Sequence, residues 1–177
     1  MQKSSGFTLI ELMVALFVLV IMVTIAIPSF QSVISGSQLE ESRDSLRSAI
    51  RYAKSEAIAL NRIVSVCPSS DGASCGDKSN WPDGWLVVTD SNQTGSVSID
   101  DVLRVFEGPD SGDVTVTDDG SLNYIRFRPD GLAENLSGSS RLFGFCDPDD
   151  NTAPKSLVVA TTTGAVSTGT EAQADCP

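Results

Sequence analysis

GFTLIE, residues 6–11, leads into the apolar run LMVALFVLVIMVTIAI at residues 12–27, and Pro28 follows it. A helix needs about 20 mostly apolar residues to span the hydrocarbon core of a bilayer, so this run predicts a membrane segment. Its one charged side chain is Glu11. A carboxylate at mid-bilayer costs up to about 3 kcal/mol and by default marks a functional pairing, so we expect Glu11 to bind a cation. The alternative is that the Glu11 side chain extends its carboxylate to the lipid headgroups near the cytoplasmic end of the membrane segment.

Length and composition narrow the class of protein. The chain has 177 residues, and the roughly 150 that follow the apolar run are enough for one globular domain with its own core. A formal net charge of -11 leaves no general attraction for nucleic acid or anionic lipid. Lys3 precedes the apolar run, so the positive-inside tendency places the N-terminus in the cytoplasm and the domain outside it.

The residues needed for common catalytic sites are missing from the sequence. It contains no histidine, which excludes Ser-His-Asp and Cys-His catalysis and histidine metal sites. The paired carboxylates Asp100-Asp101 and Asp118-Asp119 have no neighbouring general base or nucleotide-binding glycine loop. We therefore predict that the chain is not an enzyme and holds no cofactor or metal.

The four cysteines all lie beyond the apolar run, and none forms a Cys-x-x-Cys pair. This spacing favours disulfides in an oxidising compartment over a thiolate metal site. We predict that Cys67 pairs with Cys75 in a local loop and that Cys146 pairs with Cys176, which would join the C-terminus to a strand. A bond between Cys67 and Cys176 is the alternative.

An amphipathic helix is expected after Pro28, a residue that should bend the helix without ending it. Apolar or small residues then recur at the spacing of one helical stripe: Leu39, Leu46, Ile50, Ala53, Ala57 and Leu60. A coiled coil is the alternative, but the stripe is short and rich in alanine. Downstream, short β-branched or aromatic runs predict antiparallel strands at residues 63–67, 85–89, 102–106, 114–117, 124–128, 142–146 and 157–161. The fold class predicted is α+β, with antiparallel sheets packed on the long N-terminal helix.

The order of leader, Gly6, Phe7, Glu11 and apolar run resembles the N-terminal signal of type IV pilins and type II secretion pseudopilins. The resemblance implies that prepilin peptidase cleaves between Gly6 and Phe7 and that Phe7 is N-methylated. It also implies that Glu11 pairs with the N-terminus of a neighbouring subunit during assembly. An ordinary secretory signal, cleaved near Thr24-Ile25-Ala26, explains the run less well because such apolar regions are usually shorter.

The downstream sequence resembles the minor pilins of the FimT/FimU group and the related GspH pseudopilins. The segments that carry this resemblance are VCPSSDG at 66–72, WPDGWLVVTD at 81–90, DVLRV at 101–105, IRFRPDG at 125–131, and the last cysteine, Cys176. It implies a pilin-like fold with a leader at 1–6, a transmembrane and assembly segment at 7–28, an amphipathic helix at 29–62 and a β-rich periplasmic domain at 63–177.

The function that the resemblance implies is that of a minor pilin, which primes type IV pilus assembly and lies at or near the tip, supporting pilus biogenesis, twitching motility and adhesion. A minor pseudopilin of a type II secretion system is the alternative, and a DNA-uptake pilin is third. Partners would be other pilins or pseudopilins, prepilin peptidase and the bacterial inner membrane. The protein would be a single-pass membrane protein before assembly and part of a surface fibre afterwards.

One segment departs from the pattern of these relatives. Many carry a basic residue after the glycine of the last hairpin, and some bind DNA through cationic C-terminal loops. Here residues 161–168 read TTTGAVST, and the tail contains Glu171 and Asp175. We therefore expect no DNA binding.

Three further groups have a structural and a functional interpretation. The spacing from Asp90 to Asp101 partly fits a calcium loop, but a hairpin turn rich in Asx and Gly is favoured. Residues 147–151, DPDDN, could bind a cation, although an acidic solvated loop is the simpler interpretation. Trp81 and Trp85 could contact a carbohydrate or a protein, but we expect core residues whose indole N–H groups are bonded to loop carbonyls.

Overall fold

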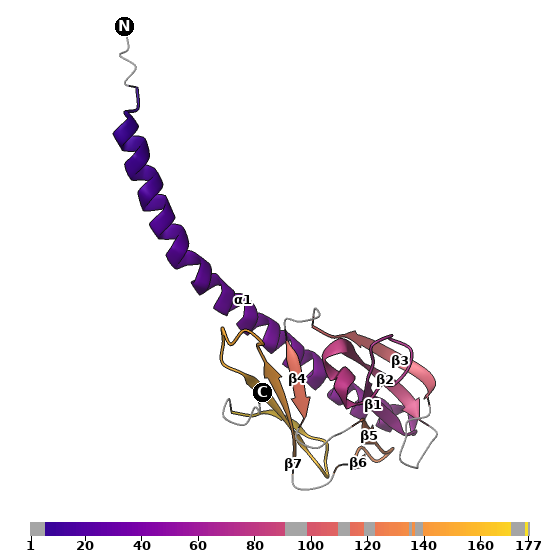
Figure 1. Ribbon diagram of the computed structural model, residues 1–177. Helices are drawn as coiled ribbons and strands as arrows, with labels where there is room; N and C mark the ends of the chain where they lie inside the picture. The colour runs from indigo at the N-terminus through magenta and orange to yellow at the C-terminus, as the bar shows by residue number, and fades with distance from the viewer. Residues whose placement is uncertain are drawn as a thin grey trace.

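The computed structural model describes residues 6–90, 99–109, 114–118, 123–134, 136, 140–170 and 176, without the side chains of residues 25–29 and 80. One helix, α1 (Leu9–Leu60, 52 residues), makes up the N-terminal part. It continues through residue 28, as expected for a proline that bends a helix without ending it. Figure 1 shows α1 as a long curved rod whose C-terminal half lies against the β-rich domain.

The half of α1 inside the domain buries one stripe of side chains. The fully buried side chains follow the three-and-four spacing expected from the sequence. They are Leu39, Leu46, Ala49, Ile50, Ala53 and Ala57. Leu60 was expected in the same stripe, but it is 42% exposed. Its exposure follows from its position, because α1 ends there. Asn61 caps the helix in the left-handed conformation, with φ 51°, a conformation that asparagine tolerates better than most residues.

The strands form two antiparallel sheets. The five-stranded sheet has the order β3-β2-β1-β5-β6 and consists of β1 (Val64–Pro68), β2 (Gly84–Asp90), β3 (Ile99–Glu107), β5 (Ile125–Phe127) and β6 (Ala133–Glu134). The four-stranded sheet has the order β4-β7-β8-β9 and consists of β4 (Thr115–Asp118), β7 (Ser140–Cys146), β8 (Lys155–Ala160) and β9 (Val166–Thr168). The α+β prediction is therefore confirmed, and each strand expected from the sequence has a counterpart.

Three elements were not expected as regular structure: β6, β9 and the 3-10 helix η1 (Lys78–Asp83). All are short, so they carry little periodic signal of their own. Side chains from both sheets and from η1 join α1 in one core. Trp81 of η1 packs edge-on against Phe143 of β7, with ring centroids 5.1 Å apart. This contact ties η1 to the four-stranded sheet.

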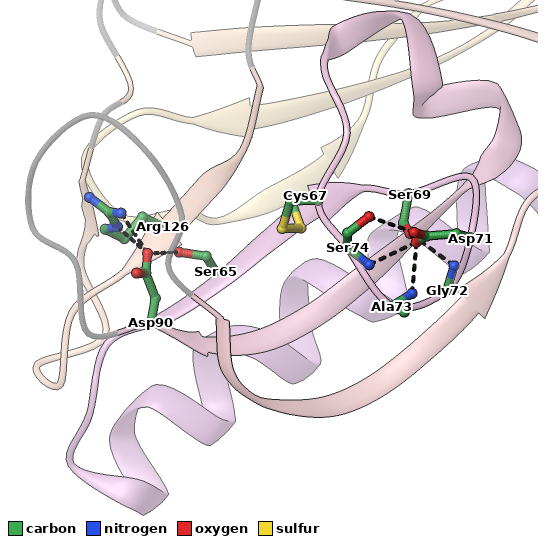
Figure 2. Close-up of a disulfide and its surroundings, with 10 residues drawn as sticks. Ser65, Cys67, Ser69, Asp71, Gly72, Ala73, Ser74, Asp90 and Arg126 are labelled. Atoms are coloured by element: carbon green, nitrogen blue, oxygen red, sulfur yellow. Dashed lines mark hydrogen bonds and ion pairs between the residues drawn. A yellow bond between two sulfur atoms is a disulfide. The ribbon is translucent and has the colours of Figure 1, made fainter.

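Two disulfides join Cys67 to Cys75 and Cys146 to Cys176, the connectivity expected from the sequence. The first closes a loop that Asp71 organises, as Figure 2 shows: its carboxylate accepts hydrogen bonds from the N–H and hydroxyl of Ser74 and from the N–H of Ala73. The hydroxyl and N–H of Ser74, with the N–H of Ala73, hold the pKa of Asp71 well below its usual range. The loop is thus stabilised by its own polar groups.

A buried ion pair fixes the end of β2. Arg126 donates from Nε and Nη2 to Oδ2 of Asp90, at 2.9 and 2.5 Å, and Ser65 donates to the same oxygen at 2.9 Å (Figure 2). The two charged side chains are 3% and 0% exposed, and the guanidinium lies 4.8 Å from the ring centre of Tyr124. Three strands of the five-stranded sheet therefore meet at one carboxylate.

Candidate assembly interface

The N-terminal part of α1 presents its apolar side chains to the outside. The large hydrophobic residues from Phe7 to Val23 are 44–87% exposed. Phe30, Val33 and Ile34 are also more than half exposed, and Leu39 is the first buried hydrophobic residue among the side chains that the structure describes. Monomeric soluble proteins rarely expose a continuous apolar surface of this size, and such a surface marks contact with a protein or a membrane.

The membrane segment predicted for residues 7–28 remains a prediction. Within the part of the chain that the structure describes, no helix meets the length and hydropathy required to cross a bilayer.

The predicted cleavage point lies at the free end of the rod. Gly6 and Phe7 precede α1 without regular structure, and both are exposed. No atom lies within 4 Å of the position that a Cβ would take at Gly6. The residues on the leader side, 1–5, are outside the described part of the chain. A peptidase could therefore reach the bond between Gly6 and Phe7 without the domain obstructing it.

Glu11 has a hydrogen-bond partner in its own chain, and its predicted pairing with the N-terminus of a neighbouring subunit remains a prediction. Its Oε2 accepts from the N–H of Thr8 at 3.0 Å and from the Thr8 hydroxyl at 2.9 Å. The Thr8 hydroxyl oxygen in turn accepts from the N–H of Glu11 at 3.3 Å. These reciprocal bonds form a capping box at the start of α1. The Thr-x-x-Glu spacing before an apolar run is the sequence signal for this capping box.

The capping box leaves part of the carboxylate available. Both bonds from Thr8 end on Oε2, and no described residue donates to Oε1 of Glu11. The carboxylate lies beside an apolar recess formed with Phe7, Ile10, Val14 and Ala15. Glu11 can therefore keep its cap and still accept a hydrogen bond from a cation on another molecule.

The tryptophans lie in the core, as expected, but one indole does not bond as expected. Trp81 and Trp85 are each 1% exposed, which removes both from any surface binding site. Trp85 was expected to donate its indole N–H to a loop carbonyl. Its buried Nε1 has no acceptor among the described residues. Trp85 lies opposite Phe106 in the register of β2 and β3, and both residues belong to the same buried core.

Among the described residues, potential cation ligands do not converge in either of the two acidic loops, the one that begins at Asp90 or residues 147–151. Asp90 is buried with Arg126, and residues 91–98, which contain the other proposed ligands, lie outside the described part of the chain. In the second loop, Asp147 accepts from the N–H groups of Asp149 and Asn151 at 3.0 and 2.9 Å. Burial raises the pKa of Asp147, but these bonds and one from the Ser35 hydroxyl outweigh it and lower the pKa. No group of three potential metal ligands occurs among the described residues.

The last hairpin has no charged residue of its own, but a cation from α1 reaches it. Lys54 donates from Nζ to the carbonyl oxygen of Thr163 at 2.7 Å. Gly164 has φ +60°, and a Cβ there would lie 2.2 Å from the ring of Phe127 in β5. Glycine is therefore required for the turn to pack on the five-stranded sheet. Lys54 thus holds the turn against α1.

Two family models match the chain. The prokaryotic N-terminal methylation motif matches residues 1–27, and the model described as type II transport protein GspH matches residues 43–164. Among solved structures, the chain resembles the type IV minor pilin FimU of Pseudomonas aeruginosa PAO1. The P21 crystal form has a TM-score of 0.58 and 20% identity, covering 78% of this chain and 93% of the crystallised FimU chain. The P65 form has a TM-score of 0.53 and 21% identity, covering 79% and 96%. At these identities the likeness shows the fold alone. No curated protein matches the sequence.

Proposed function

This chain belongs to the family described as type II transport protein GspH, and from that membership we propose that it is a minor pilin, which primes a type IV pilus and lies at or near its tip. The observation that carries the proposal is the free N-terminal part of α1, whose large hydrophobic side chains from Phe7 to Val23 are 44–87% exposed. Other subunits' helices, and the inner membrane before assembly, are the surfaces suited to cover it. In the fibre the protein supports pilus biogenesis, twitching motility and adhesion.

The proposed activity is assembly without catalysis. Residues 7–28 anchor the precursor in the inner membrane, with the domain in the periplasm, where two disulfides persist. Prepilin peptidase removes residues 1–6, and Phe7 becomes the methylated N-terminus. Glu11 then accepts the N-terminal amine of a neighbouring subunit through Oε1, while Oε2 keeps the bonds to Thr8.

Processing is tested by mass spectrometry of the membrane-extracted protein. We expect an N-methylated Phe7 as the first residue, because Gly6 and Phe7 are exposed beyond the start of α1. A chain that begins at Met1, or one cut near Ile27 by ordinary signal peptidase, would refute the proposed processing.

A minor pseudopilin of a type II secretion system is the second candidate. The description of the matching family model, type II transport protein, favours it, whereas the likeness to FimU supports a pilin fold without choosing between the two machines. Co-purification of the detergent-extracted chain with its fibre partners separates the candidates. Pilins in the complex favour the first, and secretion pseudopilins favour the second. Recovery of neither class would reject both.

Direct uptake of DNA is the third and least supported candidate. The net charge of -11 opposes contact with a polyanion, and Lys54, the cation that reaches the last hairpin, is bonded to Thr163. We expect no retention of labelled duplex DNA by the detergent-extracted chain at physiological salt. Tight binding that weakens as salt rises would favour the uptake role instead.

A further inference from the structure

The free N-terminal part of α1 leaves the domain close to Gly36. Val33 and Ile34, just before this glycine, are more than half exposed, whereas Leu39, just after it, is fully buried. Gly36 lies inside α1, and a glycine weakens the interior of a helix because its backbone has more freedom to lose than that of any other residue. An intrinsically weak point of the helix therefore coincides with the place where the domain stops covering it.

The β7–β8 loop, residues 147–154, contacts α1 at this weak point. The carboxylate of Asp147 accepts a hydrogen bond from the hydroxyl of Ser35. The hydroxyl oxygen of Thr152 lies 3.4 Å from the position that a Cβ would take at Gly36. The loop thus lies against the backbone of the helix with no side chain of residue 36 between them.

The loop is held in shape by the same carboxylate that contacts the helix. Asp147 accepts from the N–H groups of Asp149 and Asn151 through its two oxygens, and its carbonyl oxygen accepts from the N–H of Asp150 at 3.1 Å. The preceding residue, Cys146, is bonded to Cys176. A loop tied at several points can act as a support, because holding the helix does not first require ordering the loop.

A second contact follows one helical turn beyond Gly36. Nζ of Lys155, the first residue of β8, lies 3.8 Å from Oε1 of Glu40. This ion pair is partly open to solvent and contributes little by itself. Together with the bond from Ser35 to Asp147, it places polar contacts on both sides of the glycine.

We propose that the β7–β8 loop fixes the angle at which the free part of α1 leaves the domain, with Ser35, Glu40 and Asp147 as positioning residues. The inference rests on the proposed role as an assembling subunit, in which the free part packs among the helices of other subunits. A subunit whose angle is already fixed loses less conformational freedom when it packs there. Without the loop, Gly36 would act as a hinge.

A pair of matched variants tests this role. Ser35→Ala/Glu40→Ala removes both polar contacts from the helix side and leaves the hydrogen bonds within the loop intact. Alanine is the strongest helix former, so any loosening cannot come from a lower helix propensity. The control, Ser37→Ala/Glu41→Ala, removes the same two residue types from exposed positions of the same helix; the Ser37 hydroxyl bonds the carbonyl oxygen of Val33 within α1.

The angle is measured on the full chain in detergent by electron spin resonance. Spin labels are attached through Gln31→Cys on α1 and Ser167→Cys on β9, both at exposed positions. We expect one narrow distance distribution for the otherwise unaltered chain and for the control, and a broad one for Ser35→Ala/Glu40→Ala. Amide hydrogen exchange at residues 35–40 should be about two- to tenfold faster in that variant, the factor that corresponds to the loss of one hydrogen bond. An unchanged tryptophan-monitored unfolding midpoint shows that the domain itself is folded.

The proposal is overturned if the unaltered chain already gives a broad distribution, if Ser35→Ala/Glu40→Ala stays as narrow, or if the control broadens equally. Recovery with the fibre partners tests the consequence for assembly. It should fall several-fold for Ser35→Ala/Glu40→Ala and stay unchanged for the control, and equal recovery of the two would overturn the positioning role. If the unaltered chain is recovered with no fibre partner, the proposed function fails, while the measured distances still decide whether the loop fixes the angle.

Discussion

The buried pair of Asp90 and Arg126 offers a sharp test of how the domain is held together. Asp90→Ala removes an oxygen that accepts three hydrogen bonds: two from Arg126 and one from Ser65. Truncating one partner of a buried ion pair typically costs about 3–5 kcal/mol, because the other charge stays buried. Tyr124 still lies 4.8 Å from the guanidinium and retains about 1 kcal/mol of cation–π stabilisation. We therefore expect the free energy of unfolding to fall by about 3–4 kcal/mol.

Denaturant unfolding of the full chain in detergent measures this change. The two tryptophans of the chain, Trp81 and Trp85, are both buried in the domain, so their fluorescence reports the domain and not the free part of α1. Asp100→Ala is the matched control. It breaks an ion pair with Arg62 that is partly open to solvent and should cost less than about 1 kcal/mol.

The double variant Asp90→Ala/Arg126→Met isolates the cause. If a buried charge without its carboxylate is the source of the loss, removing that charge should recover part of the stability. A cost below about 1 kcal/mol for Asp90→Ala, or a double variant no more stable than the single one, would refute the reasoning. Calcium should not change the unfolding midpoint of the wild type, because Asp90 is bonded to Arg126 and not available as a ligand.

Three further predictions follow from the same structure. Glu11→Val should leave the tryptophan-monitored unfolding midpoint unchanged, since the capping box lies at the free end of α1, yet should remove the chain from sheared fibres; normal incorporation would show that the carboxylate is not needed. Replacing Cys146 and Cys176 by serine should cost roughly 3 to 4 kcal/mol on the chain-entropy estimate, more than the same change at Cys67 and Cys75, because it opens the longer loop; equal losses in denaturant would contradict that estimate. The pKa of Asp71 is lower in the folded domain than in the unfolded chain, so Asp71 contributes stability that is fully present above pH ~4 and is lost as the pH falls through the folded pKa. When unfolding is followed during acid titration, Asp71→Asn should therefore lose less stability below pH ~4 than the wild type does. Identical titration curves would count against this role of Asp71.

The N-terminal organisation could be predicted because its signals are local. Glycine, an aromatic residue and a carboxylate precede one long apolar run, and the helical stripe from Leu39 to Ala57 recurs with the helix period. The longer strands could also be predicted from β-branched and aromatic runs, because these residues pack well on a half-buried pleated sheet. The missed strands β6 and β9 are two and three residues long, too short for any period. The capping box of Thr8 and Glu11 was within reach of the sequence, because its spacing is local too.

By itself, the sequence determined the long helix, the α+β class and the position of the N-terminal methylation motif, because each depends on neighbours within a few residues. Only the tertiary structure decided which distant groups meet. Asp90 and Arg126 are 36 residues apart and pair because β1 lies between β2 and β5 in the sheet. Lys54 and Thr163 are 109 residues apart, and Glu41 and Glu107 share a cleft because β3 ends beside α1. Strand order depends on the packing of the whole core, and no local pattern encodes it.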